Sequence, residues 1–224
     1  MNLLGIDTST AVTSVCVMRS DGAAFERVPE VEALAEPPGH TRELLPAIDA
    51  QLRRAGLGFA DLNGVAAGVG PGTFTGLRIG IVTARALGQA HDLDLWPVSS
   101  LAALAAGMHA PARLAVIDAR RGQVFASLHD GSGVAWAPFV DTPGGLIERL
   151  EAWAGDRPLA AGDGALRYRG ELEAAGIEVA DAGSDTHVVR ALHICRLAAD
   201  TAPSEPEAVV PDYLRDPDAK PRDE

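Results

Sequence analysis

The same order of residue types occurs twice, in LLGIDTSTAVTSVCV (residues 3–17) and in LAVIDARRGQVFASL (residues 114–128). Each stretch is an apolar run that reaches Ile-Asp, makes a short polar turn and continues as a second β-like run, which is typical of a β-hairpin. The repeat places Asp7 and Asp118 at equivalent strand ends. We therefore predict an α/β protein of two related lobes, residues 1–100 and 101–224, each a mixed sheet with helices on its faces.

A helical pattern follows the first hairpin. Apolar residues recur at intervals of three and four between residues 41 and 55, at Leu44, Leu45, Ile48 and Leu52. Pro46 requires this helix either to begin near it or to kink there. The remaining order of expected elements is a strand at 64–69, a helix from about 73 to 91, strands and helices alternating to 176, a last helix at 186–200 and a proline-rich tail extended over the surface.

The composition excludes several classes of function. A formal charge of -12 repels polyphosphate, so a nucleic-acid role requires a basic partner or a locally basic surface. Lys220 is the only lysine, which removes the P-loop lysine and makes a Schiff base implausible.

The compartment follows from the cysteines and from the apolar segments. Cys16 and Cys195 form neither a disulfide framework nor a CxxC pair, and we interpret them as buried thiols. The amino terminus has no basic region before its short apolar run, and charged residues and a proline interrupt the apolar segment 101–117. These features predict a cytoplasmic protein without a membrane span.

The glycine-rich loop in GVGPGTFTGLRIG (residues 68–80) has two interpretations. A strand, a glycine turn and a helix that begins near Thr73 can present backbone N–H groups to an anion. Gly70 and Gly72 can equally make a tight turn before a helix that Thr73 caps. Neither GxGxxG nor GxxxxGK[ST] is present, so the loop alone does not decide.

The helix after this loop has one face with almost no side chains, made by Gly76, Gly80, Ala84 and Gly88. Three glycines within a helix cost about 3 kcal/mol relative to alanine, so another backbone must approach this face closely. The approaching element can belong to the same chain or to another molecule, and Leu77 lies where it can fill the rim of the contact.

Other polar residues carry weaker signals. Asp7, Thr8 and Ser9 follow a strand and can hold a metal-bound water or a phosphate, but such residues more often satisfy a hairpin turn. His40 has no histidine at position 44, so the helical zinc pair is missing, and no GxSxG stretch supports a hydrolase triad. We therefore predict neither catalytic residues nor a metal site.

Six segments together resemble the TsaB (YeaZ) family, whose members act in tRNA threonylcarbamoyladenosine biosynthesis. They are LLGIDTST, HTRELLPAID, GVGPGTFTGLRIGIVTARALG, PVSSLAAL, VIDARRGQVFAS and PDYLRDPDAK, and they follow one another in the family's order over nearly the whole chain. The resemblance implies the two-lobed actin-like ATPase (ASKHA, ribonuclease H-like) fold, in agreement with the duplicated hairpin.

The resemblance also implies a role without catalysis. TsaD, the related transferase, binds a metal through an HxxxH pair, and Ser100 and Leu104 stand at the corresponding positions here. Without these ligands the chain lacks a Lewis acid for the threonylcarbamoyl group. The implied role is that of an accessory subunit which binds TsaD, with the ATPase TsaE assisting and with tRNA contacted only indirectly.

The family's binding surface, carried onto this sequence, is formed by the two helices of the amino-terminal lobe. The resemblance thus favours an interface with TsaD, or with a second copy in isolation, at Leu44, Leu45, Ile48, Leu52, Gly76, Leu77, Gly80, Ala84 and Gly88. Gly80→Leu or Ala84→Arg is then expected to abolish the complex while the lone chain stays folded.

Two alternatives remain at this point. One is a nucleotide switch that holds ATP or ADP between the lobes at Asp7, Thr8, Ser9, Gly70 and Gly72; the other is a peptidase that acts on TsaD. No cofactor is assigned to the chain itself, and ATP or ADP at the boundary with TsaD stays open.

Overall fold

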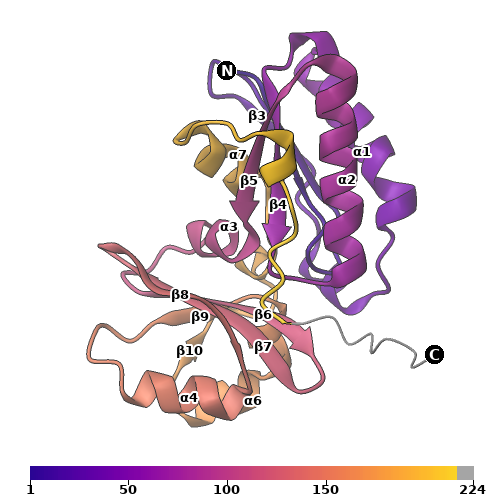
Figure 1. The fold of residues 1–224 in the computed structure, drawn as a ribbon. Coiled ribbons are helices and arrows are strands. Elements are labelled where there is room, and N and C mark those ends of the chain that lie inside the picture. Colours follow the sequence, from indigo (N-terminus) through magenta and orange to yellow (C-terminus); the bar gives the residue numbers. More distant parts are fainter. Residues whose placement is uncertain (216–224) are drawn as a thin grey trace, which may run out of the picture.

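The computed structural model describes residues 1–215 and consists of two five-stranded sheets with helices between and around them (Figure 1). The strands of the first sheet are β1 (Leu3–Asp7), β2 (Ser14–Met18), β3 (Ala24–Glu26), β4 (Gly64–Gly70) and β5 (Asp94–Ser99). Those of the second are β6 (Arg113–Arg120), β7 (Gln123–Asp130), β8 (Gly133–Asp141), β9 (Leu159–Ala161) and β10 (Glu178–Val179).

The two sheets have the same topology, which confirms the predicted α/β class and the duplication. Their strand orders are β3-β2-β1-β4-β5 and β8-β7-β6-β9-β10. In each sheet an antiparallel meander is followed by two parallel strands on the other side of its first strand. Asp7 and Asp118 lie near the ends of the equivalent strands β1 and β6, as the repeated Ile-Asp predicts.

Helices cover both sheets on both faces. They are α1 (His40–Ala55), α2 (Phe74–His91), α3 (Ser100–Ala106), α4 (Pro143–Glu151), α5 (Asp163–Arg167), α6 (Arg169–Ala174) and α7 (Ala191–Ala199), and the short 3-10 turns are η1 (Val31–Ala35), η2 (Phe59–Asp61), η3 (Asp185–His187) and η4 (Pro206–Ala208). The helices α1 and α2 lie side by side along the first sheet, and α7 packs on its other face (Figure 1).

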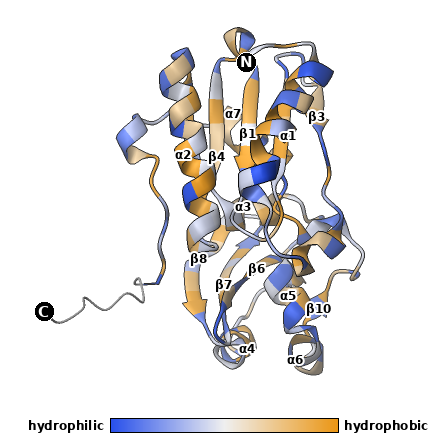
Figure 2. Cartoon of the chain, turned by 90° about the vertical axis from the view of Figure 1, so that its right-hand side faces the viewer, coloured by the Kyte–Doolittle hydropathy of each residue, from blue (hydrophilic) through white to orange (hydrophobic). Residues whose placement is uncertain are grey.

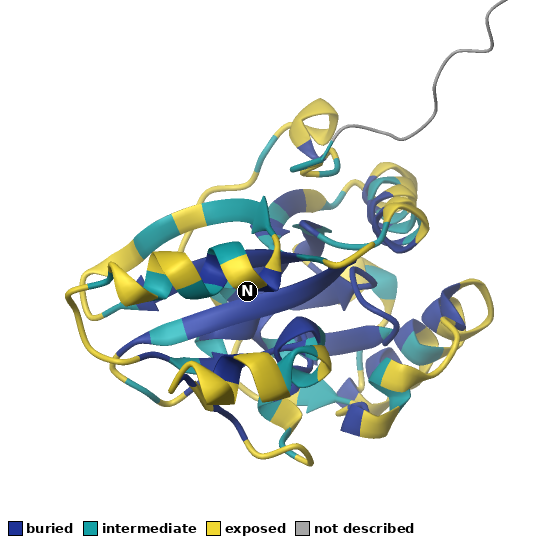
Figure 3. Ribbon diagram, turned by 90° about the horizontal axis from the view of Figure 1, so that it is seen from below, coloured by how far each residue is buried: buried dark blue, intermediate teal, exposed yellow. Residues whose placement is uncertain are grey.

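Three apolar cores follow from this layering, and the central strands are buried in all of them (Figure 3). One core lies between α1, α2 and the first sheet, where hydrophobic residues fill β1 and β4 (Figure 2). A second core, around α3 and α7, joins the two sheets, and it contains both free cysteines, which are buried as predicted. The third lies under α4, α5 and α6.

Two predicted boundaries can be compared with the structure. The helix α1 begins at His40 and keeps Pro46 in its interior, so the alternative that it begins near the proline is wrong, and the alternative of a kink there stays a prediction. The helix α7 follows residue 100 and so falls in the predicted second lobe, but it packs on the first sheet, where it contacts β1, β2, β4 and β5. Gly5 of β1 permits this contact, since a Cβ there would lie 2.6 Å from the carbonyl oxygen of Ala191.

The carboxyl-terminal segment also returns to the first lobe. Ser204 forms an isolated bridge with Leu95 at the edge of β5, and Val209 is fully buried in the core under α2. The predicted surface tail is therefore anchored as far as Arg215, and its last residues, 216–224, lie outside the described part of the chain. None of the helices within residues 1–215 is both long and apolar enough to cross a membrane.

Candidate functional site

The glycine face of α2 is sealed inside its own lobe. A Cβ at Gly76 would overlap the carbonyl oxygen of Thr8, and one at Gly80 would overlap the hydroxyl of the same threonine. Ala84 is fully buried, and a Cβ at Gly88 would lie 2.9 Å from Leu95 Cδ2. The face thus lets α2 approach the β1–β2 turn and β5, so its close neighbours belong to the same lobe and we do not keep it as the proposed partner interface.

Most of the apolar stripe on α1 also faces the inside of the first lobe. Leu44, Ile48, Leu52 and, on α2, Leu77 are all buried in the core between these helices and the first sheet. The hydrophobic period of 3.6 residues therefore marks the inward side of the helix, as it does in most amphipathic helices. Of the residues predicted to bind a partner, Leu45 alone is exposed, at 61%.

The opposite sides of α1 and α2 present apolar side chains to solvent. Leu45 on α1 and Phe74 and Val82 on α2 are exposed at 61%, 45% and 64%, and we call these three residues the outer face. A groove of about 450 Å³ lies between the amino-terminal ends of the two helices, with Phe74 and Ile79 in its wall. Apolar side chains that gather on one surface beside a groove make that surface a candidate for protein binding.

His40 at the start of α1 has a structural role. Its Nε2 lies 3.1 Å from the carbonyl oxygen of Thr10 and its Nδ1 lies 2.8 Å from Thr13 Oγ1. Because a carbonyl can only accept, Nε2 carries the proton and Nδ1 accepts from the threonine hydroxyl. Burial lowers the pKa of His40, which keeps the ring neutral while it ties α1 to the β1–β2 turn.

The predicted nucleotide-binding residues in the β1–β2 turn use their polar groups for hydrogen bonds within the chain. Asp7 Oδ1 accepts hydrogen bonds from the N–H and the hydroxyl of Ser9, at 2.9 and 2.7 Å. Thr8 Oγ1 donates to the carbonyl oxygen of Gly76 at 2.7 Å. All three side chains are buried, so none faces a ligand in this conformation.

The glycine loop before α2 is also occupied by contacts with the chain's own backbone. The N–H of Thr73 donates to the carbonyl oxygen of Ser9 at 2.7 Å, and a Cβ at Gly72 would overlap that same oxygen. A Cβ at Gly70 would lie 3.1 Å from the carbonyl oxygen of Asp212. These glycines therefore admit the chain's own backbone, and the structure favours the interpretation of the loop as a turn over that of an anion site.

Burial makes Asp7 an unusual carboxylate. Its pKa is raised to about 6, mainly because burial removes it from water, while hydrogen bonds from Ser9 and Ser100 offset part of that effect. The Ser100 hydroxyl donates to Asp7 Oδ2 at 2.9 Å. The charged form therefore destabilises the fold at neutral pH, and the side chain serves as a buried acceptor for the turn.

Replacing Asp7 by asparagine is expected to raise the free energy of unfolding at pH 8 by about 1–2 kcal/mol, because the amide carries no charge to desolvate. Since the folded-state pKa lies above that of the unfolded chain, the cost of the charge is present above about pH 6 and fades as the pH falls towards about 4. Urea unfolding at pH 8 and pH 4.5 measures the difference.

The matched control for this prediction is Asp156→Asn, an exposed aspartate whose replacement should leave stability unchanged at both pH values. Equal stability of Asp7→Asn and the unaltered chain at pH 8 would show that Asp7 carries no desolvation cost.

Ser100 and Leu104, the two positions that the family resemblance compares with metal ligands, make internal contacts here. Ser100 donates to Asp7, and Leu104 is buried in the core between the sheets. Leucine has no donor atom, so this helix cannot supply the pair of ligands. Within residues 1–215 no group of three or more His, Cys, Asp or Glu side chains is arranged to hold a metal ion.

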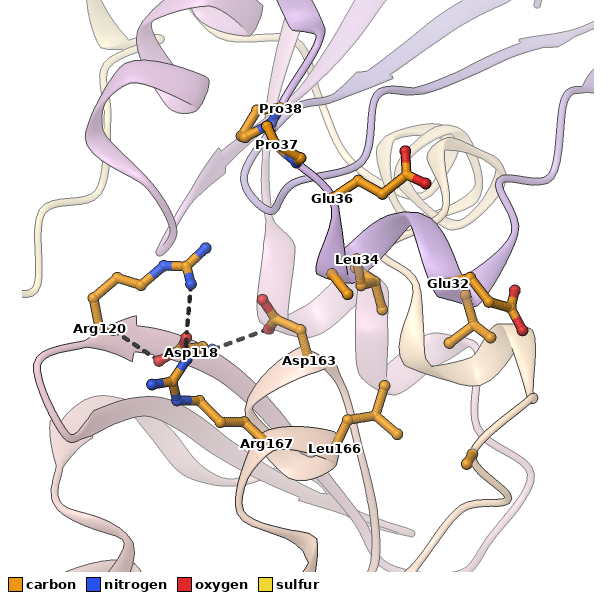
Figure 4. Close-up of a pocket in the computed structure, with 13 residues that line it drawn as sticks. Glu32, Leu34, Glu36, Pro37, Pro38, Asp118, Arg120, Asp163, Leu166 and Arg167 are labelled. Atoms are coloured by element: carbon orange, nitrogen blue, oxygen red, sulfur yellow. Dashed lines mark hydrogen bonds and ion pairs between the residues drawn. The ribbon is translucent and has the colours of Figure 1, made fainter.

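A pocket of about 730 Å³ lies between the lobes, and none of the residues predicted to hold a nucleotide there lines it (Figure 4). One wall is the segment 31–38 of the first lobe, and the other comes from the end of β6 and from α5. Its polar centre is the buried Asp118, whose Oδ2 lies 3.2 Å from Arg120 Nη1 and 3.4 Å from Arg167 Nη1. Both arginine side chains are about half exposed.

Asp163 completes the polar wall of this pocket. It accepts a hydrogen bond from the backbone N–H of Asp118 at 3.0 Å, and its carboxyl group lies opposite Leu34 and Pro37 (Figure 4). Removal from water raises its pKa to about 6, although the N–H of Asp118 offsets part of the shift. Only Asp118 stood out in the sequence, because the other residues come from separate segments without a shared pattern.

Comparison with known proteins identifies the family. Residues 35–221 match the family model described as TsaD: tRNA N6-adenosine threonylcarbamoyltransferase. The chain belongs to this family. Within the TsaD family it is 28% identical to the tRNA threonylcarbamoyladenosine biosynthesis protein TsaB of Bacillus subtilis, over 96% of this chain and 94% of that protein.

Two further relatives match over nearly the full length of the chain. A protein of Mycobacterium tuberculosis is 34% identical over 98% of this chain and 94% of its own. The solved structure of YeaZ from Pseudomonas aeruginosa superposes with a TM-score of 0.76 at 29% identity, covering 95% of this chain and 99% of that one. The chain is thus a homologue of TsaB (YeaZ) inside the TsaD family, and the predicted two-lobed actin-like fold is confirmed.

Proposed function

We propose that the chain is a non-catalytic partner of a TsaD-type transferase in the formation of threonylcarbamoyladenosine in tRNA. The observation that supports this most strongly is what Ser100 and Leu104 do at the two positions where the family resemblance leads us to look for metal ligands. Ser100 donates its hydroxyl hydrogen bond to Asp7, and Leu104 is packed in the core between the sheets. The helix α3 therefore lacks the pair of side chains that would hold a Lewis acid beside the substrate. The chemistry then belongs to the partner.

The surface that we propose for this partner is the outer face, not the buried glycine face. Leu45, Phe74 and Val82 are exposed apolar residues on two adjacent helices, and a partner that covers them gains their burial. Binding there can raise the partner's activity only by favouring one of its conformations. In this proposal TsaE is the ATPase that assists the complex, and the complex works in the cytoplasm. The chain forms a homodimer through the same face when the partner is absent. Contact with tRNA is made by the partner.

Reconstitution tests this function. Threonylcarbamoyl transfer to tRNA is measured with the cognate TsaD and TsaE, with and without the chain, and with heat-denatured chain as the protein control. We expect transfer to fall at least about tenfold when the chain is left out, since the partner then lacks its favoured conformation. Full transfer without the chain would contradict the proposal.

A nucleotide switch is the second candidate, and the inter-lobe pocket is the observation in its favour. That pocket is lined by Arg120 and Arg167 and by none of the predicted residues Asp7, Thr8, Ser9, Gly70 and Gly72. Calorimetry of the isolated chain with ADP and magnesium separates the two candidates. Micromolar binding that Arg167→Ala removes and Asp7→Asn leaves intact would favour the switch.

A peptidase has less support. One Ser–His contact, Ser127 Oγ to His129 Nε2 at 3.0 Å, lies on β7, but both side chains are buried, and a substrate does not reach them in this conformation. Incubation of purified TsaD with the chain, followed by mass spectrometry of the products, tests this third possibility.

A further inference from the structure

The last described residues of the chain cross from the first lobe to the second. We call residues 209–215 the strap, and Figure 1 shows this segment in yellow, running from beside α2 towards β6 and β7. Val209 is fully buried in the first lobe. The N–H of Asp212 then donates to the carbonyl oxygen of Val69 at 2.7 Å, which fixes the strap at the end of β4.

The middle of the strap is held on the amino-terminal end of α2. Tyr213 stacks on Phe74 with ring centroids 5.4 Å apart, and its hydroxyl accepts a hydrogen bond from Arg78 Nε at 3.0 Å. The Arg78 guanidinium also lies over the Phe74 ring, 3.8 Å from its centroid. Tyr213 therefore belongs to the same exposed surface as Phe74 of the outer face.

The end of the strap is held on the second lobe. Arg215 Nη1 donates to the carbonyl oxygen of Ala119 at 3.3 Å and to Gln123 Oε1 at 3.1 Å. These two residues flank the β6–β7 turn, where Arg120, Arg121 and Gly122 all have positive φ. Arg120 of this turn binds Asp118 and lines the inter-lobe pocket.

We propose that the strap is a clasp between the lobes, which links the surface at Phe74 to the β6–β7 turn and so to the wall of the inter-lobe pocket. Tyr213 and Arg215 are two residues apart, so the contact of Tyr213 with α2 keeps the Arg215 guanidinium close to its acceptors at a high effective concentration. When Tyr213 leaves α2, Arg215 leaves the turn more often, and the turn loses its support from the first lobe.

The link acts within a single chain and can be tested without any partner. Hydrogen exchange is measured by mass spectrometry on the full chain, on Tyr213→Ala and on Arg215→Ala, with circular dichroism to confirm the fold. Arg53→Ala is the matched control, because Arg53 forms its ion pair with Asp49 inside α1 and does not join the lobes.

We expect Tyr213→Ala to raise exchange in residues 119–123 by about threefold or more, although Tyr213 has its contacts on α2. Arg215→Ala should raise exchange in residues 119–123 by a similar factor, because this substitution removes the contact with the turn directly. Arg53→Ala should leave it unchanged. Faster exchange in Tyr213→Ala at the start of α2 alone, or at no site, would overturn the proposal.

Discussion

Replacing Gly76 by alanine is expected to destabilise the isolated chain by about 3 kcal/mol or more. The added methyl group would overlap the backbone carbonyl oxygen of Thr8, which cannot rotate away as a side chain can. Helix propensity acts in the opposite direction, since alanine is favoured over glycine by about 1 kcal/mol in a helix interior. The sign of the change therefore decides whether this face is packed or free, and urea unfolding measures it.

Gly170→Ala is the matched control for this prediction. Gly170 lies in α6, and a Cβ there would meet no atom within 4 Å, so we expect equal or slightly higher stability. A gain in stability for Gly76→Ala would mean that the glycine face is open. The same packing applies at Gly80 and Ala84, so Gly80→Leu and Ala84→Arg should unfold the lone chain, contrary to the expectation from sequence.

Replacing Val82 by arginine is expected to weaken the complex with the TsaD-type partner about 100-fold or more. Val82 is 64% exposed in the middle of α2, and the proposed interface would bury an unpaired charge at that point. The fold should be unaffected, because arginine is a better helix former than valine. Titration of labelled partner with the purified variant measures the affinity.

Val134→Arg provides the control for this second prediction. Val134 is 60% exposed on β8 of the second lobe, so the substitution has the same chemistry at a distance from α1 and α2. We expect the Val134 variant to bind like the unaltered chain. Equal weakening by both variants would indicate a general effect of added charge, and no weakening by Val82→Arg would place the interface elsewhere.

The fold followed from the sequence because its signals are local. The repeated Ile-Asp hairpin indicated two related sheets, and the period of three and four residues marked α1. No local pattern in the sequence indicated that α7 packs on the first sheet. This packing depends on Gly5, a single glycine in β1 that makes room for a helix almost 190 positions later.

The candidate site was harder to predict, for two physical reasons. A helix face without side chains requires a close neighbour but does not identify it, and here the neighbour of Gly76 and Gly80 is Thr8 of the same lobe. The inter-lobe pocket combines residues 31–38 with Asp118 and Asp163, which only the folded chain brings together. Leu45 was the one predicted contact residue that the structure leaves exposed.

Our central proposal is that a TsaD-type partner covers the outer face of α1 and α2. Hydroxyl-radical footprinting of the chain, free and in complex, reads the exposure of individual side chains on that face. We predict strong protection of Leu45, Phe74 and Val82 in the complex, with Val134 labelled equally in both states. Unchanged labelling of Leu45, Phe74 and Val82, with protection of Leu34 and Leu166 at the inter-lobe pocket, would contradict this placement of the partner.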